Sequence, residues 1–198
     1  MSLTDVLQPV TETQVRDTYA ASSASPLVFA RNEVSFQYVG NNNIDGMKVI
    51  YFAAFFNVAS EPLLEKELER WLCANRRLLG QPGTRGKVAV RVKFYLRGKF
   101  HRSGFATYIV NREEDLFRAW GAREIHTPAM EAGRWVWTRA KFGYSIPQFD
   151  FDALQQSYRD WQRSERTGDP VRAASLADFP REFLLSSAVS TIQLFKSL

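Results

Sequence analysis

The sequence predicts an α+β protein, with a four-stranded antiparallel sheet, two helices on one of its faces, and further helical extensions. Three observations lead to this class. Short apolar runs bounded by turn residues alternate with stretches whose apolar residues recur at helical spacing. One run, residues 87–97, switches between apolar and polar side chains with a period of two. An apolar fraction of 45% that includes 15 Phe is enough to fill a core.

The composition limits both the cellular compartment that we expect and the kinds of binding site that the chain can form. The single cysteine, Cys73, excludes an internal disulfide and indicates a reducing compartment inside the cell, whether nucleus, cytoplasm or organelle matrix. With only His101 and His126 as imidazole ligands, we expect no metal site, and no cofactor is expected either. No apolar run approaches the ~20 residues of a membrane-spanning helix, and the N-terminus lacks the pattern of a secretory signal. We therefore expect no membrane contact.

Positive charge is concentrated in one stretch of the chain. Between Arg70 and Arg112 there are 11 Lys and Arg residues and no Asp or Glu, although the net charge of the whole chain is only +5. A basic segment in an otherwise acidic chain is typical of proteins that bind a polyanion. A basic surface that serves only solubility is the other reading.

The first part of the chain is predicted to hold an N-terminal extension and then a strand and a helix. The extension, residues 1–46, contains a short helix at 11–21 and an extended stretch at 27–39. Residues 47–56 form a short run of apolar and aromatic residues, which indicates a buried strand. Residues 60–80 begin with a serine N-cap, carry apolar side chains on one helical face and end in glycine, which predicts a helix.

Residues 87–97 give the clearest pattern in the chain. Val88 and Val90 alternate with residues such as Arg91 and Lys93. A period of two places the first set in the core and the second on an open face of the sheet. A sheet with one wet face favours antiparallel pairing.

The second part of the chain is predicted to complete the sheet and then to become helical. Residues 105–110 are expected to form a strand, and Asn111 then caps a helix. Residues 134–140 are expected to form the last strand of the sheet. After Pro147 the apolar spacing is helical again, and the tail 179–198 favours a helix while leaving a strand open.

Two short segments resemble the signature peptides of the RNA-recognition-motif (RRM) family. Residues 50–55, IYFAAF, are similar to the hexapeptide on the family's first strand. Residues 103–110, SGFATYIV, are similar to the octapeptide on its third strand. The resemblance covers residues 47–142 and implies an RRM-like domain of ferredoxin-like order, β-α-β-β-α-β. Residues 143–198 are then a C-terminal helical extension.

The resemblance implies an RNA-binding protein that holds single-stranded RNA on the open sheet face, as part of a ribonucleoprotein assembly with protein partners. Aromatic rings stack on bases and cations contact phosphates. Side-chain parity places four aromatic residues on that face, and the basic strands and the loop after them supply cations. The predicted RNA-binding residues are Tyr51, Phe105, Trp135, Trp137, Arg91, Lys93, Tyr95, Arg97, Lys99, Arg102 and Arg139.

A second role stays open, and catalysis is not expected. The helices after Pro147 are long enough to cover the aromatic row, which would make the domain a protein-binding adaptor. The glycine-rich segment 80–86 precedes a strand and lacks the Gly-Lys-Ser/Thr ending of a phosphate-cradling loop. Asp150 and Asp152 are explained by helix capping. The sequence therefore predicts a protein that is not an enzyme.

Overall fold

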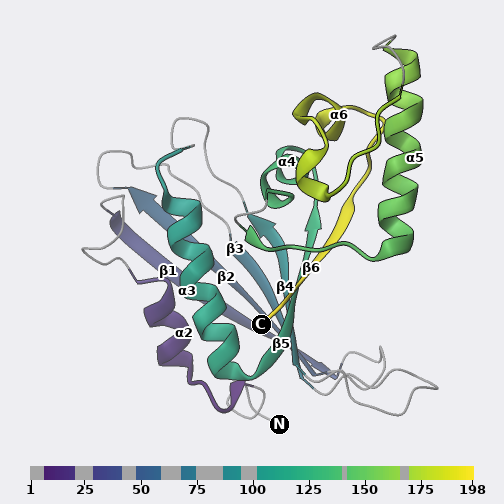
Figure 1. The fold of residues 1–198 in the computed structure, drawn as a ribbon. Helices are drawn as coiled ribbons and strands as arrows, with labels where there is room; N and C mark the ends of the chain where they lie inside the picture. Colours follow the sequence, from purple (N-terminus) through teal and green to yellow (C-terminus); the bar gives the residue numbers. More distant parts are fainter. Residues whose placement is uncertain are drawn as a thin grey trace, which may run out of the picture. The chain divides into compact units, whose positions relative to one another are not determined.

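The predicted α+β class is confirmed by a computed structural model in which six strands, and not the predicted four, form one sheet, with helices before, between and after them along the chain (Figure 1). The described residues are 7–20, 29–41, 48–58, 68–74, 87–94, 102–139, 142–165 and 170–198. The strands follow the order β1-β2-β3-β4-β5-β6 in the sheet. They are β1 (Phe29–Asn41), β2 (Lys48–Val58), β3 (Leu68–Ala74), β4 (Lys87–Phe94), β5 (Ala122–Ala129) and β6 (Ile192–Ser197).

The first four strands form an antiparallel meander. β1 pairs with β2, β2 with β3, and β3 with β4, each antiparallel to its neighbour. Tyr51 on β2 lies opposite Gln37 on β1 and Trp71 on β3. The predicted strand 47–56 and the predicted extended stretch 27–39 are thus confirmed over the described residues 48–56 and 29–39, and they are partners in the sheet.

A helix joins β4 to its next neighbour, β5. Helix α3 (Phe105–Trp120) follows β4 and precedes β5 in the chain, and it runs back along the sheet. The arrows of β4 and β5 point the same way (Figure 1). Parallel neighbours need such a crossover connection, and a helix is its usual form. The end of β4 and the start of α3 therefore lie at the carboxyl end of a parallel strand pair.

The other helices are shorter than α3 except for one, α5. Helix α2 begins after Thr11 with a capping box. The Thr11 side chain accepts a hydrogen bond from the backbone amide of Gln14, and the Gln14 side chain accepts one from the backbone amide of Thr11. The predicted helix at 11–21 is confirmed over residues 12–18, and the predicted helix after Pro147 over residues 148–164. The helical elements are α2 (Glu12–Thr18), α3, α4 (Ala132–Trp137), α5 (Gln148–Ser164), the 3₁₀ turn η3 (Leu176–Asp178) and α6 (Arg181–Leu185).

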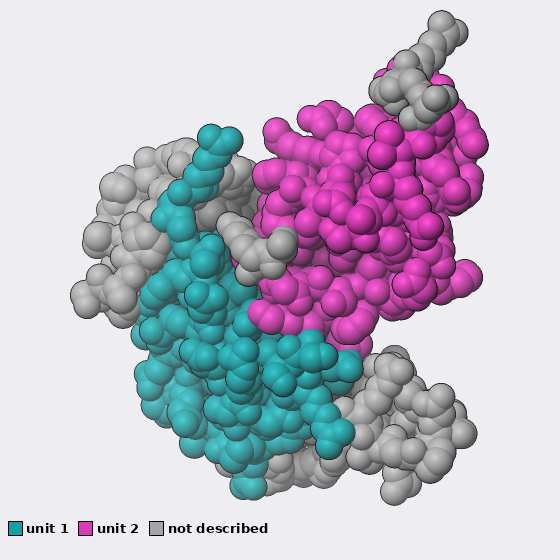
Figure 2. All heavy atoms as spheres, in the orientation of Figure 1, with its two compact units in different colours: residues 1–125, 197–198 teal, residues 126–196 magenta. Residues whose placement is uncertain are grey.

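The chain divides into two compact units, coloured separately in Figure 2. Unit 1 contains residues 1–125 and 197–198, and unit 2 contains residues 126–196. The predicted divisions after residues 46 and 142 do not coincide with this one.

The predicted strand 105–110 is wrong, because these residues form the first turns of α3. Phe105, Ile109 and Phe117 recur at helical spacing and are buried, as are Glu113 and Trp120. A helix that starts at Phe105 places this whole stripe on one face, where it is buried. The predicted β-α-β-β-α-β order is consequently not the order of the described elements.

The predicted helix at 60–80 is wrong over residues 68–74, which form β3. Leucine-rich sequence favours a helix locally, but tertiary pairing overrides such a preference. β3 is hydrogen-bonded to a strand on each edge, β2 and β4. That pairing satisfies the backbone on both sides and decides the conformation.

The end of the chain needs two further corrections. The predicted strand 134–140 is wrong, since helix α4 occupies residues 132–137. The strand β5, which precedes it, was not expected, although its residues alternate between buried and more exposed positions. In the tail 179–198 both readings hold in part, because α6 is a helix and β6 is a strand.

Candidate functional site

The turn before α3 has an unusual backbone. Arg102 and Gly104 both have positive φ, 67° and 82°. Glycine tolerates this conformation, but for an arginine it costs about 1–2 kcal/mol. Non-glycine residues held in this way occur preferentially at functional sites.

The first backbone N–H groups of α3 are open. Gly104 has no side chain to cap the helix, and the first helical turn contains no acidic residue. Ser103 Oγ accepts a hydrogen bond from the amide of Phe105 at 3.3 Å. Within the described chain the amides of Ala106 and Thr107 have no acceptor. Open amides and the positive end of a helix dipole together favour an anion.

The side chains around this turn leave room for a ligand. Arg102, Gly104 and Thr107 are exposed, and Ser103 and Ala106 are half-buried. The two hydroxyl groups, the guanidinium and the free amides are all donors. The turn is therefore an accessible cluster of hydrogen-bond donors with one fixed positive charge.

A buried ion pair fixes α3 to β4 beneath the site. Arg91 Nε on β4 lies 3.1 Å from Glu113 Oε2 on α3, and the two side chains are 1% and 0% exposed. The hydroxyl of Tyr19, which follows α2, donates to the other Glu113 oxygen at 2.9 Å. This network positions α3, and with it the open turn, against the strand.

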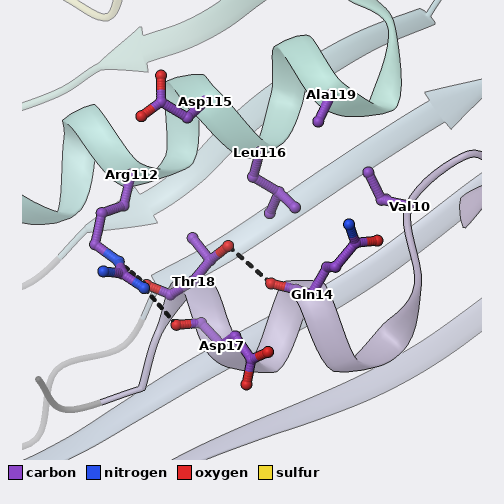
Figure 3. A pocket seen from close by; sticks show the side chains of 8 residues that line it. All are labelled: Val10, Gln14, Asp17, Thr18, Arg112, Asp115, Leu116 and Ala119. Atoms are coloured by element: carbon purple, nitrogen blue, oxygen red, sulfur yellow. Dashed lines mark hydrogen bonds between the residues drawn. The ribbon is translucent and has the colours of Figure 1, made fainter.

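Arg112 on α3 also links this helix to the end of α2 (Figure 3). Its Nε donates to the carbonyl of Thr18 at 2.7 Å, and its Nη2 donates to that of Asp17 at 2.5 Å. These carbonyls end α2, where a cation is favoured. A shallow hollow of about 360 Å³ lies beside this contact; its walls are Val10, Gln14, Asp17, Thr18, Arg112, Asp115, Leu116 and Ala119.

Lys87 anchors the start of β4. Its ammonium group donates to the carbonyls of Gln8 and Trp120, the latter at 2.8 Å, and lies 4.9 Å from the centre of the Trp120 ring. Burial of the charged form lowers the pKa of Lys87 below its ordinary value of 10.5.

The lowered pKa of Lys87 predicts how stability depends on pH. Between the lowered pKa and 10.5 the folded protein binds fewer protons at this site than the unfolded chain, so the free energy of unfolding should rise with pH there. Lys87→Met should lack this component. Urea unfolding of both proteins from pH 8 to 10.5 should show the wild type gaining on the variant as pH increases. A difference that stays constant, or that falls, would contradict this assignment.

The structure moves several predicted RNA-binding residues into the core. Phe105 is 0% exposed, Trp137 is 7% exposed, and Arg91 is 2% exposed within its ion pair. Ala89, on the same predicted open face as Arg91, is 0% exposed as well. Arg91 is buried by its ion pair with α3, whereas the Trp137 ring packs against Phe142 and Tyr144 in unit 2. The buried rings of Phe105 and Trp137 therefore offer no face to a base.

The remaining predicted residues divide into three groups. Tyr51 and Lys93 lie on β2 and β4, and only their backbone is described. Arg102 is exposed in the turn before α3, whereas Trp135 and Arg139 come together in unit 2. Tyr95, Arg97 and Lys99 lie outside the described residues.

Trp135 in unit 2 has two guanidinium groups against its ring. Arg139 lies 4.8 Å and Arg181 5.5 Å from the ring centre. Arg139 also donates to the carbonyls of Trp135 and Phe179, at 3.3 and 3.4 Å, so its position is fixed. Arg181 is exposed. The sequence predicted two of these three residues and missed Arg181, which lies more than 40 residues away in the chain.

Comparisons with known proteins identify no relative, so a function can be proposed only from the geometry described above. No protein-family model, curated protein or solved structure matches the chain. Among the described residues there is no group of His, Cys, Asp or Glu side chains that could hold a metal ion. The helices in that part of the chain include none with the length and apolar character needed to cross a membrane.

Proposed function

We propose that the protein binds the pyrophosphate of a nucleotide-derived cofactor at the N-terminus of α3, and that this cofactor is coenzyme A. The observation that carries the proposal is the turn of Arg102 and Gly104, which leaves the amides of Ala106 and Thr107 open. Phosphates bind at helix N-termini through such amides and the helix dipole. The turn also follows β4, at the carboxyl end of a parallel pair, where ligands of α/β units bind.

Coenzyme A fits this turn better than a dinucleotide or a nucleoside triphosphate. Dinucleotide sites carry G-x-G-x-x-G, and triphosphate loops carry G-x-x-x-x-G-K-S/T; the sequence contains neither pattern. Coenzyme A has a pyrophosphate and a further phosphate on its ribose. This negative charge complements the exposed guanidinium of Arg102 in the same turn.

The chemistry of this cofactor gives the class of reaction to test. Coenzyme A carries acyl groups as thioesters on its thiol, which lies at the end of the molecule remote from the phosphates. The proposal therefore predicts transfer of an acyl group from its coenzyme A thioester to a nucleophilic acceptor, with release of the coenzyme A thiol. It departs from the expectation that the chain is not an enzyme.

Titration calorimetry at low salt tests the proposal. We expect coenzyme A to bind at least tenfold more tightly than NAD or ATP, with an affinity that falls as salt is added because the contacts are to phosphates. Equal affinities for all three would contradict the choice of cofactor. An absence of heat with every pyrophosphate compound would overturn the site itself.

Single-stranded RNA binding is a second candidate function, favoured by the cluster of Trp135, Arg139 and Arg181. An aromatic ring with guanidinium groups beside it offers stacking to a base and charge to its phosphate. The basic stretch between Arg70 and Arg112 supports the same reading. The ribonucleoprotein role and the protein-binding adaptor stay predictions beside it.

Arg181→Glu tests the RNA candidate. Because Arg181 is exposed, the reversal should leave the fold intact while placing a negative charge on the Trp135 ring. Fluorescence anisotropy with a labelled single-stranded RNA should then report a loss of affinity of at least tenfold. Arg163→Glu is the control, since Arg163 is also exposed but pairs with Asp160 on α5. Equal losses of RNA affinity in both variants would mean that the loss comes from the change in net charge and not from the cluster around Trp135.

A further inference from the structure

A second hollow lies within unit 2, between α5 and the segment that follows it. Its volume is about 210 Å³, and its walls are Asp152, Gln155, Arg159 and Arg172. The first three residues are on α5, at positions that share one face of the helix. Arg172 comes from the segment 170–175.

Two glutamines on α5 hold the segment 170–175, which contributes the other wall of the hollow, in place. Gln155 is 4% exposed; its Oε1 accepts from the amide of Ala173 at 3.3 Å, and its Nε2 donates to the carbonyl of the same residue. Gln162, two turns further along α5, accepts from the amide of Val171 at 3.1 Å. The backbone on both sides of Arg172 is therefore fixed to α5, and Arg172 is positioned beside the hollow before any ligand arrives.

The two arginines can both donate to one ligand. In the described part of the chain Arg172 has no hydrogen bond or ion pair, and Arg159 has one hydrogen bond, to Gln156 Oε1 at 2.7 Å. Two guanidinium groups on opposite walls attract an oxyanion, to which they donate charge-assisted hydrogen bonds. The position of both arginines in one small hollow indicates an anion site.

Asp152 decides which anion fits. Its Oδ1 accepts from Gln148 Nε2 at 2.9 Å, and a carboxylate in this wall can accept another hydrogen bond but donate none. Sulfate and carboxylates, which carry no proton at neutral pH, are repelled by Asp152. Hydrogen phosphate has an O–H group that can donate to Asp152 while its other oxygens accept from the arginines. We infer that this hollow is a binding site for inorganic phosphate in its protonated form.

Titration of the full-length protein with inorganic phosphate and, separately, with sulfate tests the inference. Phosphate should bind at least tenfold more tightly than sulfate. Arg172→Gln should weaken phosphate binding at least tenfold, whereas Arg163→Gln, the same change elsewhere on α5, should leave it unchanged. Asp152→Asn should bring the two anions to similar affinity, because an amide can donate to sulfate as well.

Two outcomes of these titrations would overturn the site, and a third comes from the Thr107→Glu variant. One is phosphate binding that responds equally to Arg172→Gln and Arg163→Gln; the other is a preference for sulfate. The titrations are repeated with Thr107→Glu, which places a carboxylate at the N-terminus of α3. Phosphate binding that persists there belongs to the α5 hollow, and binding that disappears belongs to the turn before α3, which would contradict the inference.

Discussion

Thr107→Glu should abolish most of the affinity for coenzyme A, with a loss of at least tenfold in titration calorimetry. Thr107 is exposed in the first turn of α3, and its amide is among the open ones. A glutamate there repels the phosphates and can itself occupy the helix terminus. A carboxylate near a helix N-terminus stabilises the helix by about 0.3–1 kcal/mol, so the melting temperature should not fall. Lost binding with unchanged stability would locate the phosphates at this turn.

Asn111→Glu is the matched control for this prediction. It makes the same change of charge on the same exposed surface of α3, one turn further along the helix. The amide of residue 111 lies within the helical hydrogen-bond ladder, so the substitution leaves the open turn untouched. We expect at most a twofold change in affinity. If Asn111→Glu weakened binding as much as Thr107→Glu, the helix terminus would have no special role.

Arg91→Met should destabilise the protein by about 3–5 kcal/mol in urea unfolding. Arg91 and Glu113 form a buried ion pair, and removal of the arginine leaves the Glu113 carboxylate buried without the guanidinium charge beside it. Tyr19 still donates to Glu113, but one neutral donor does not replace a guanidinium. This cost is a large part of the stability of a typical domain.

The double variant Arg91→Met/Glu113→Leu separates the ion pair from packing. Replacement of a buried pair by apolar side chains of similar size is often neutral, so most of the lost stability should return. Tyr19→Phe belongs in the same series, because the double variant leaves its hydroxyl without Glu113. A double variant as unstable as Arg91→Met would mean that the arginine acts through its shape and not through its charge.

Elements with a strong local signal could be predicted from the sequence. The strands around residues 47–56 and 87–97 and the helix after Pro147 are examples, since period and turn residues agree there. β3 could not, because its leucines favour a helix and only pairing with β2 and β4 decides against it.

The start of α3 could have been predicted, and the resemblance to an octapeptide hid it. Phe105, Ile109 and Phe117 keep helical spacing through the segment interpreted as a strand, and Gly104 precedes them. The glycine turn was thus visible as a helix start, and with it the open amides. The burial of Arg91 was not visible, because it depends on Glu113 and on Tyr19, which is 94 residues from Glu113.

The network of Tyr19, Arg91 and Glu113 has a consequence for how this chain can diverge. A hydroxyl, a guanidinium and a carboxylate that contact one another inside a protein cannot be replaced one at a time without a large loss of stability. Related sequences should therefore retain all three residues or exchange them as a set, with apolar residues in their place. Positions 19, 91 and 113 should consequently co-vary, and that triplet is a marker by which distant relatives can be recognised.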